Sequence, residues 1–170
     1  MKDIVLIGMP SCGKTTIGKK IAEKMHRKFF DTDEILEKKF GITIADFIMQ
    51  FGEEKFREQE QEVIIEVSKN TGAVIATGGG AMLEKRNVRH LKHNGMLFFI
   101  DKDLALLKST SDRPLSSNQD KLAKMFAVRR PLYEKNADVG VDGNLSIEQT
   151  ANLILEKWRQ KNENFSFERA

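Results

Sequence analysis

The chain has 170 residues, of which 40% are hydrophobic and 31% are charged, and its formal net charge is +3 at pH 7. This composition is typical of one globular domain and excludes a disordered chain, and no apolar run approaches the ~20 residues that a membrane-spanning helix needs. The basic residues form no block, so we expect no nucleic-acid partner. We also expect no membrane partner, since no apolar run is long enough, and a monomer.

Along the chain, short apolar stretches that predict buried strands alternate with helical patterns. The strands are expected at residues 4–8, 28–31, 73–80, 96–101 and 137–142. The helical patterns consist of Ile17, Ile21 and Met25; Phe56, Val63, Ile64 and Val67; Val88 and Leu91; Leu104 and Leu107; Leu122 and Phe126; and Ile147, Ala151, Ile154 and Trp158. This alternation predicts an α/β fold with a parallel sheet covered on both faces. The periodicity ends after about Gln160, so we expect a single domain over residues 1–160 and a frayed tail over residues 161–170.

The first predicted strand leads into a phosphate-binding loop. Residues 8–15 read GMPSCGKT and match G-x-x-x-x-G-K-[ST], between a strand and a helix as this motif requires. In such a loop the backbone N–H groups and the positive end of the helix hold a polyphosphate. Lys14 would reach the β- and γ-phosphates of a nucleotide, and the Thr15 hydroxyl would ligate Mg²⁺. The residues expected to bind the nucleotide are Ser11, Cys12, Gly13, Lys14, Thr15 and Thr16.

Cys12 is the only cysteine of the chain. It cannot form an internal disulfide, which predicts a reducing, cytoplasmic location. A thiol at a helix N-terminus can be sensitive to oxidation, because the thiolate is favoured there. We favour the simpler interpretation that Cys12 is a small packing residue.

Two aspartates, Asp31 and Asp33, end the second predicted strand, where α/β sheets bind ligands. The pair is explained if one carboxylate lies near Mg²⁺ and the other accepts a hydrogen bond from the hydroxyl of a phosphoryl acceptor. Asp33 is also placed to cap the following helix, and the two roles are compatible.

Further segments point to a second substrate. The sequence TGGG at residues 77–80 places three consecutive glycines after a buried strand, which indicates that the backbone closely approaches another group. Arg57 lies among several glutamates, where a solvated face of ion pairs is the ordinary interpretation. The segment DRPLS at residues 112–116 is a candidate lid over the phosphates. The segment RRPLYEKNAD at residues 129–138 places two arginines before a proline that is expected to interrupt the helix.

In this order and at these distances, the segments GMPSCGKTTIG, DTD, GEEKFR, TGGGA, RPL and RRPLYEKNAD resemble the shikimate kinase family over residues 2–158. The resemblance implies a three-layer P-loop kinase fold of the nucleoside-monophosphate-kinase type. In that fold a five-stranded parallel sheet in the order 2-3-1-4-5 is flanked by helices, and a lid covers about residues 109–119. It also implies transfer of the γ-phosphoryl group of ATP to the 3-hydroxyl of shikimate, with Mg²⁺ as cofactor.

On the nucleotide side, the resemblance implies that Lys14 is the phosphate-loop lysine and Thr15 the Mg²⁺ ligand. Asp31 matches the acidic residue that holds the metal through water. Arg113 matches the lid arginine that closes on the ATP phosphates.

On the acceptor side, Asp33 matches the aspartate that binds shikimate hydroxyls near the reacting oxygen. Arg57 and Arg129 match the pair that binds the shikimate carboxylate, and the planar guanidinium suits that role. The resemblance also implies that the backbone around Gly79 and Gly80 forms the third wall of the acceptor site, and that Gly78 binds the substrate with them.

Two positions depart from the family pattern. Ser11 stands where a glycine is usual, and the segment at residues 142–149, near Ser146, lacks the arginine that many members place beside adenine. A gluconate or nucleotide kinase would share the phosphate loop and the lid, but it would not need TGGG and two separated arginines. A non-enzymatic nucleotide switch would need no second substrate site.

Overall fold

The computed structural model describes residues 1–107 and 119–167, the last five of these by their backbone alone. Of the predicted lid at residues 109–119, only Gln119 is described. Arg113, which belongs to this lid, lies outside the described residues. Among the helices that are described, none is both long and apolar enough to cross a membrane.

Five parallel strands form one sheet in the order β2-β3-β1-β4-β5, which confirms the predicted topology. The strands are β1 (Asp3–Ile7), β2 (Phe29–Asp31), β3 (Val74–Ala76), β4 (Gly95–Asp101) and β5 (Val139–Asp142). In the register, Val5 of β1 lies beside Ile75 of β3 on one side and Leu97 of β4 on the other. Because all strands are parallel, their carboxyl ends meet at one edge, where an α/β sheet places its binding site.

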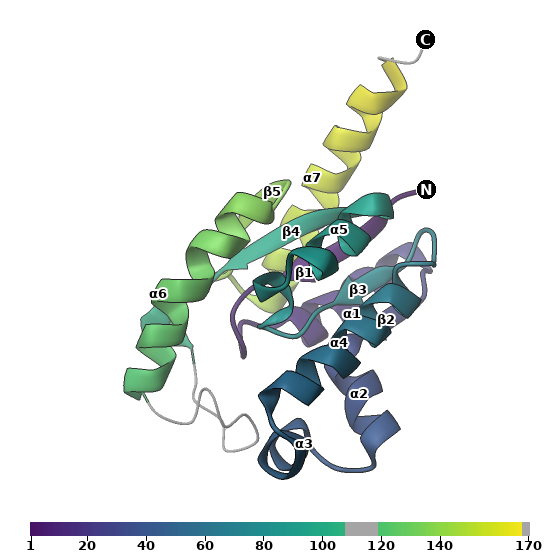
Figure 1. The fold of residues 1–170 in the computed structure, drawn as a ribbon. Coiled ribbons are helices and arrows are strands. Elements are labelled where there is room, and N and C mark those ends of the chain that lie inside the picture. Colours follow the sequence, from purple (N-terminus) through teal and green to yellow (C-terminus); the bar gives the residue numbers. More distant parts are fainter. Residues whose placement is uncertain (108–118, 168–170) are drawn as a thin grey trace.

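Helices cover both faces of the sheet (Figure 1). They are α1 (Lys14–Met25), α2 (Thr32–Phe40), α3 (Ile44–Phe51), α4 (Glu53–Val67), α5 (Lys85–Asn94), α6 (Gln119–Asn136) and α7 (Ile147–Phe167), with short 3₁₀ helices at Ala81–Leu83 and Leu104–Leu106. Helices α1 and α7 pack together on one face, and α4, α5 and α6 lie toward the other. The molecule is therefore the three-layer fold that the alternating pattern predicts.

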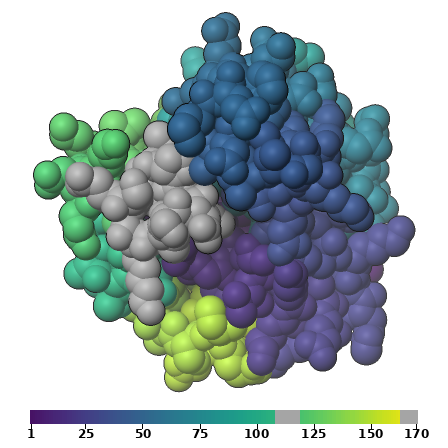
Figure 2. Space-filling model, turned by 90° about the horizontal axis from the view of Figure 1, so that it is seen from below, coloured from purple at the N-terminus to yellow at the C-terminus, as the bar shows by residue number. Residues whose placement is uncertain are grey.

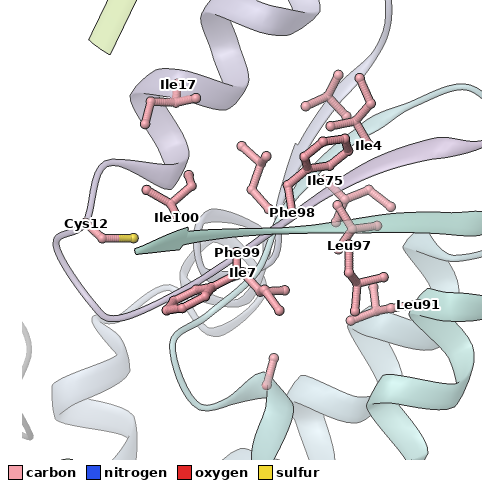
Figure 3. Close-up of a cluster of buried hydrophobic side chains, with 14 of the residues drawn as sticks. Ile4, Ile7, Cys12, Ile17, Ile75, Leu91, Leu97, Phe98, Phe99 and Ile100 are labelled. Carbon is pink, nitrogen blue, oxygen red and sulfur yellow. The ribbon is translucent and has the colours of Figure 1, made fainter. Parts of the chain in front are cut away.

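The core consists of strand side chains that alternate between the two faces (Figure 3). Phe98 and Ile100 of β4 point to the same side as Ile17 of α1, whereas Leu97 points toward Leu91 of α5. All five are at most 2% exposed. Strands buried on both faces need apolar side chains at successive positions, which explains the continuous apolar runs.

Four details of the predicted elements were wrong. The sequence analysis did not identify α2 and α3 as separate helices. Pro131 does not interrupt a helix but lies inside α6, and the helical pattern does not end at Gln160, since α7 continues to Phe167 and extends away from the sheet (Figure 1). The pair Leu104 and Leu107 marks only a single 3₁₀ turn.

Candidate active site

The phosphate loop connects β1 to α1 at the carboxyl edge of the sheet. Its glycines are required by geometry: Gly13 has φ +100°, and a Cβ on Gly8 would lie 2.9 Å from both the Cys12 sulfur and the Ile100 carbonyl oxygen. Ser11 adopts φ 65°, in the left-handed region that favours glycine. Ser11, which stands where a glycine is usual, therefore adopts a backbone conformation typical of glycine, and this conformation is strained for a serine.

The Cys12 side chain is 1% exposed and packs inside this loop against Gly8 (Figure 3). Its burial supports the packing interpretation, because a thiol that reacts readily with oxidants is normally accessible.

The Lys14 side chain lies inside the phosphate loop and is 6% exposed. Its Nζ donates hydrogen bonds to the carbonyl oxygens of Gly8 (2.9 Å) and Met9 (2.8 Å), and the Cys12 sulfur lies 3.6 Å away. These bonds hold a positive charge where the first turn of α1 already presents unpaired N–H groups. Thr16, in the same turn, is exposed. The loop therefore combines the charge and the donors that a polyphosphate needs.

The two residues expected to hold the metal lie in direct contact. The Thr15 hydroxyl donates to Oδ2 of Asp31 at 2.5 Å. The other oxygen of Asp31, Oδ1, accepts from the backbone N–H groups of Asp33 (2.9 Å) and Glu34 (3.2 Å). Asp31 is thus the N-cap of α2, so the capping role that the sequence left open for Asp33 belongs to Asp31. A hydroxyl and a carboxylate beside a phosphate site fit Mg²⁺, which prefers oxygen ligands and takes the others from phosphates and water.

Three different segments approach the three consecutive glycines that follow β3. A Cβ on Gly78 would lie 2.6 Å from Oδ1 of Asp33, and one on Gly79 would lie 2.7 Å from Cδ of Pro10 in the phosphate loop. A Cβ on Gly80 would lie 2.6 Å from Cζ of Arg57. Real Cβ atoms do not occur at such distances, so with Asp33, Pro10 and Arg57 in their present positions no Cβ fits at any of the three glycines, and the close approach that the sequence analysis inferred is present. The triplet brings together the phosphate loop, Asp33 and Arg57.

Arg57 does not lie on a solvated face, which corrects the ordinary interpretation of its glutamate-rich surroundings. Its side chain is 14% exposed, and it pairs with Glu60 at 2.8 Å and with Glu53 at 3.1 Å. Burial by itself lowers the pKa of Arg57, but these carboxylates outweigh that effect and hold the pKa above its ordinary value. Burial raises the pKa of Glu60, although the charges of Arg57 and Arg129 oppose the rise. The guanidinium is therefore fixed and remains charged.

Arg129 reaches the same place from α6 and is 7% exposed. Burial lowers the pKa of Arg129, and the nearby positive charge of Arg57 lowers it further, while Tyr133 and Glu60 oppose both effects. Two buried guanidinium groups that repel each other are stabilised by an anion between them. The pair therefore fits a carboxylate.

Two side chains of this site were not identified from the sequence. Glu60 follows Arg57 by three positions and Tyr133 follows Arg129 by four, which are the spacings of neighbours on one helix face. Each is 1% exposed. Oε1 of Glu60 has no hydrogen-bond partner among the described residues, and it lies 3.0 Å from the position of a Cβ on Gly78. The helical spacing from each arginine was the signal available in the sequence.

The segment at residues 142–149, which lacks the arginine that many family members place beside adenine, caps a helix in this structure. Ser146 precedes α7, where its hydroxyl accepts from the backbone N–H of Gln149 (3.2 Å) and Oε1 of Gln149 accepts from the backbone N–H of Ser146 (3.1 Å). This reciprocal pair is a capping box.

Figure 2 shows the purple N-terminal segment reaching the surface between the blue segment near residue 50 and the yellow-green start of α7.

Comparison with known proteins identifies related chains. A family model described as Shikimate kinase matches residues 10–159. A shikimate kinase of Caldicellulosiruptor bescii is 43% identical over 164 residues, which cover 92% of this chain and 93% of that protein.

Solved structures give the same result. The shikimate kinase of Acinetobacter baumannii, solved in complex with shikimate, superposes with a TM-score of 0.88 at 30% identity, over 96% of this chain and 94% of the other. A gluconokinase of Sinorhizobium meliloti reaches a TM-score of 0.62 at 14% identity, over 99% and 98% of the two chains. The second likeness concerns the fold alone.

Proposed function

Because the chain belongs to the shikimate kinase family and is an ATP-dependent kinase that phosphorylates shikimate, we propose that the residues around Gly78, Gly79 and Gly80 form its acceptor site. In this site Arg57 and Arg129 bind the shikimate carboxylate, and Asp33 binds the hydroxyls at the opposite end of the ring. The contacts of the glycine triplet carry the proposal, since they bring Arg57 and Asp33 to one short loop beside the phosphate loop.

The reaction forms a bond between the 3-hydroxyl oxygen of shikimate and the γ-phosphorus, and breaks the bond from that phosphorus to the oxygen that leaves with ADP. Asp33 orients the hydroxyl and accepts its proton. Lys14 holds negative charge on the β- and γ-phosphates, and the N–H groups of residues 11–16 hold the remaining phosphate oxygens. For Arg113, which lies outside the described residues, we propose from the family resemblance alone that it stabilises charge on the ATP phosphates.

Thr15 and Asp31 are the groups that would hold Mg²⁺ in this chain. When bound, the ion neutralises charge on the phosphates. The contact between Thr15 and Asp31 supports this assignment, because both oxygen donors already face one position beside the phosphate loop.

An assay of ADP release tests the acceptor. The chain is supplied with ATP and, in parallel, with shikimate, quinate, gluconate or a nucleoside monophosphate. We expect turnover with shikimate to exceed turnover with every other acceptor. Preferred use of gluconate or a nucleotide would overturn the acceptor assignment, and slow ATP hydrolysis that no acceptor stimulates would instead indicate a nucleotide switch.

We further propose that the protein acts in the cytoplasm as a monomer, without a nucleic-acid or membrane partner. Its single cysteine is a free thiol buried in the phosphate loop, which is consistent with a reducing compartment. A mass measurement in solution, by light scattering, tests the monomer; a dimer mass would contradict it.

A further inference from the structure

The side chain of Thr32 joins the start of α2 to the glycine triplet. Thr32 is the first residue of α2, between Asp31 and Asp33, and it is 0% exposed. Its hydroxyl oxygen accepts a hydrogen bond from the backbone N–H of Gly78 at 3.0 Å. The bond therefore connects the segment that carries both aspartates of the site to the first glycine of the triplet.

This bond continues the connection between two strands where their backbone pairing ends. The last paired residues of β2 and β3 are Asp31 and Ala76. Beyond them, β2 leads into α2 and β3 leads into the glycine triplet. Gly78 is buried, and a buried N–H without a partner is unfavourable. The hydroxyl of Thr32 takes the place of a strand carbonyl and holds the triplet beside α2.

The backbone of Gly78 is in turn packed tightly against Asp33. A Cβ on Gly78 would lie 2.6 Å from Oδ1 of Asp33 and 3.0 Å from Oε1 of Glu60, so Gly78 lies between two carboxylates. In a close-packed interior such contacts transmit small displacements. A shift of Gly78 would therefore displace the Asp33 carboxylate, while the contact of Asp31 with Thr15 holds the other end of the segment at the phosphate loop.

Phosphoryl transfer is sensitive to displacements of this kind. The attacking oxygen must lie in line with the phosphorus at about 3–3.5 Å, and a misplacement of about 1 Å can lower the rate about a hundredfold. In the proposed site, Asp33 orients the attacking oxygen and the glycine triplet forms a wall against the acceptor. The reaction therefore depends on the position of Asp33 relative to the triplet.

We propose that Thr32 is a positioning residue for the reaction, whose hydroxyl holds the glycine triplet at a fixed distance from Asp33. The inference rests on the proposed function, since it assumes that Asp33 orients the acceptor hydroxyl and that the triplet binds the acceptor. Thr32 is fully buried, so it acts through Gly78 and Asp33 and touches neither substrate.

Thr32→Val tests the inference, because it removes the hydroxyl and nearly keeps the shape of the side chain. Steady-state kinetics of ADP release with shikimate should show a kcat that is lower by roughly ten- to hundredfold. The KM for ATP should change by less than about twofold, because the substitution leaves the phosphate loop intact. A folded Thr32→Val enzyme with a kcat near the wild-type value would overturn the inference.

Thr32→Ser separates positioning from stability. It keeps the hydroxyl and removes one buried methyl group, so the melting temperature should fall while kcat stays within about twofold of the wild-type value. If the role of Thr32 were only structural, kcat would follow the melting temperature in both variants. An equal loss of kcat in Thr32→Ser and Thr32→Val would therefore overturn the inference.

Thr77→Val is the matched control. The Thr77 side chain is also buried, and its hydroxyl donates to the carbonyl oxygen of Leu6 in β1 at 3.0 Å, directly before the glycine triplet. The substitution should lower the melting temperature and leave kcat within about twofold of the wild-type value. A fall of kcat equal to that in Thr32→Val would overturn the inference, because any lost bond near the triplet would then suffice.

A double-variant cycle separates this inference from the proposed site. In an Asp33→Asn background, adding Thr32→Val should lower kcat by less than about twofold, because the group that Thr32 positions is already disabled. An unchanged kcat for Thr32→Val beside an impaired Asp33→Asn enzyme would overturn only the role of Thr32, as would fully independent effects or failure of Thr32→Val to fold. A fully active Asp33→Asn enzyme would overturn the role of Asp33 itself, and this inference with it.

Discussion

Replacing Gly80 by alanine should selectively disturb shikimate binding. Gly80 has φ −89° and ψ 0°, a conformation that alanine tolerates, so the backbone does not require glycine. The requirement comes from Arg57, whose Cζ would lie 2.6 Å from the new Cβ. Ordinary contact between carbon atoms needs about 3.5 Å, so the guanidinium must move by about 1 Å.

Arg57 cannot make this move freely. It is held by Glu60 at 2.8 Å and Glu53 at 3.1 Å, and Glu60 is itself 1% exposed. A guanidinium displaced by about 1 Å loses at least one hydrogen bond to the substrate carboxylate. Such a charged bond contributes about 1.5–3 kcal/mol, which corresponds to roughly a ten- to hundredfold loss of affinity. We therefore expect the KM for shikimate to rise by that factor, and the KM for ATP to stay near its wild-type value.

The assay is ADP release at saturating ATP over a range of shikimate concentrations, repeated at saturating shikimate over a range of ATP concentrations. Gly140→Ala is the matched control, because a Cβ on Gly140 meets no atom within 4 Å. This control should bind both substrates normally. A Gly80→Ala enzyme with an unchanged shikimate KM would refute the reasoning, since the guanidinium would then not need its position beside Gly80.

Three further predictions concern the other parts of the fold. Asp33→Asn should lower kcat by roughly 10²–10⁴, because it removes the proton acceptor, with little change in melting temperature now that Asp31 is known to cap α2; a fully active variant would exclude Asp33 from proton transfer. Ser11→Gly should raise the free energy of unfolding in urea by about 1 kcal/mol, because glycine relieves the strain at φ 65°; a less stable variant would contradict this. Hydrogen bonds with Lys20 and Lys24 lower the pKa of Glu148 from 4.5 to about 2, so these pairs stabilise the fold above about pH 4.5 and lose this effect as the pH falls toward 2. Glu148→Gln should reduce the difference in melting temperature between pH 7 and pH 3, and an unchanged difference would show that the pairs do not contribute.

Much of the fold could be predicted because its signals are local. The apolar runs of β1 and β4 are long enough to indicate buried strands, and the phosphate-loop motif is contiguous. Helices α2 and α3 lack such a signal: α2 has only two buried residues, Thr32 and Leu36, and α3 is too short for a clear period. Propensity alone also predicted that Pro131 breaks α6. There the proline forgoes one hydrogen bond, but Arg129 and Tyr133 on the same helix are buried in the site, and this packing stabilises the helix around it.

The site was less predictable than the fold, because side-chain partners depend on contacts between distant segments. The sequence placed Asp31 and Asp33 together at a strand end, but it did not indicate which of them caps α2. Only the fold brings Pro10 against Gly79 and the hydroxyl of Tyr133 against the Gly79 carbonyl. These contacts join positions more than fifty residues apart, which no local pattern records.

A crystal structure of this chain with shikimate bound tests the central claim most directly. The account predicts the shikimate carboxylate within hydrogen-bond distance of both Arg57 and Arg129, and the 3-hydroxyl within hydrogen-bond distance of the Asp33 carboxylate. A shikimate bound in the reverse orientation, or with its carboxylate away from both arginines, would contradict the account.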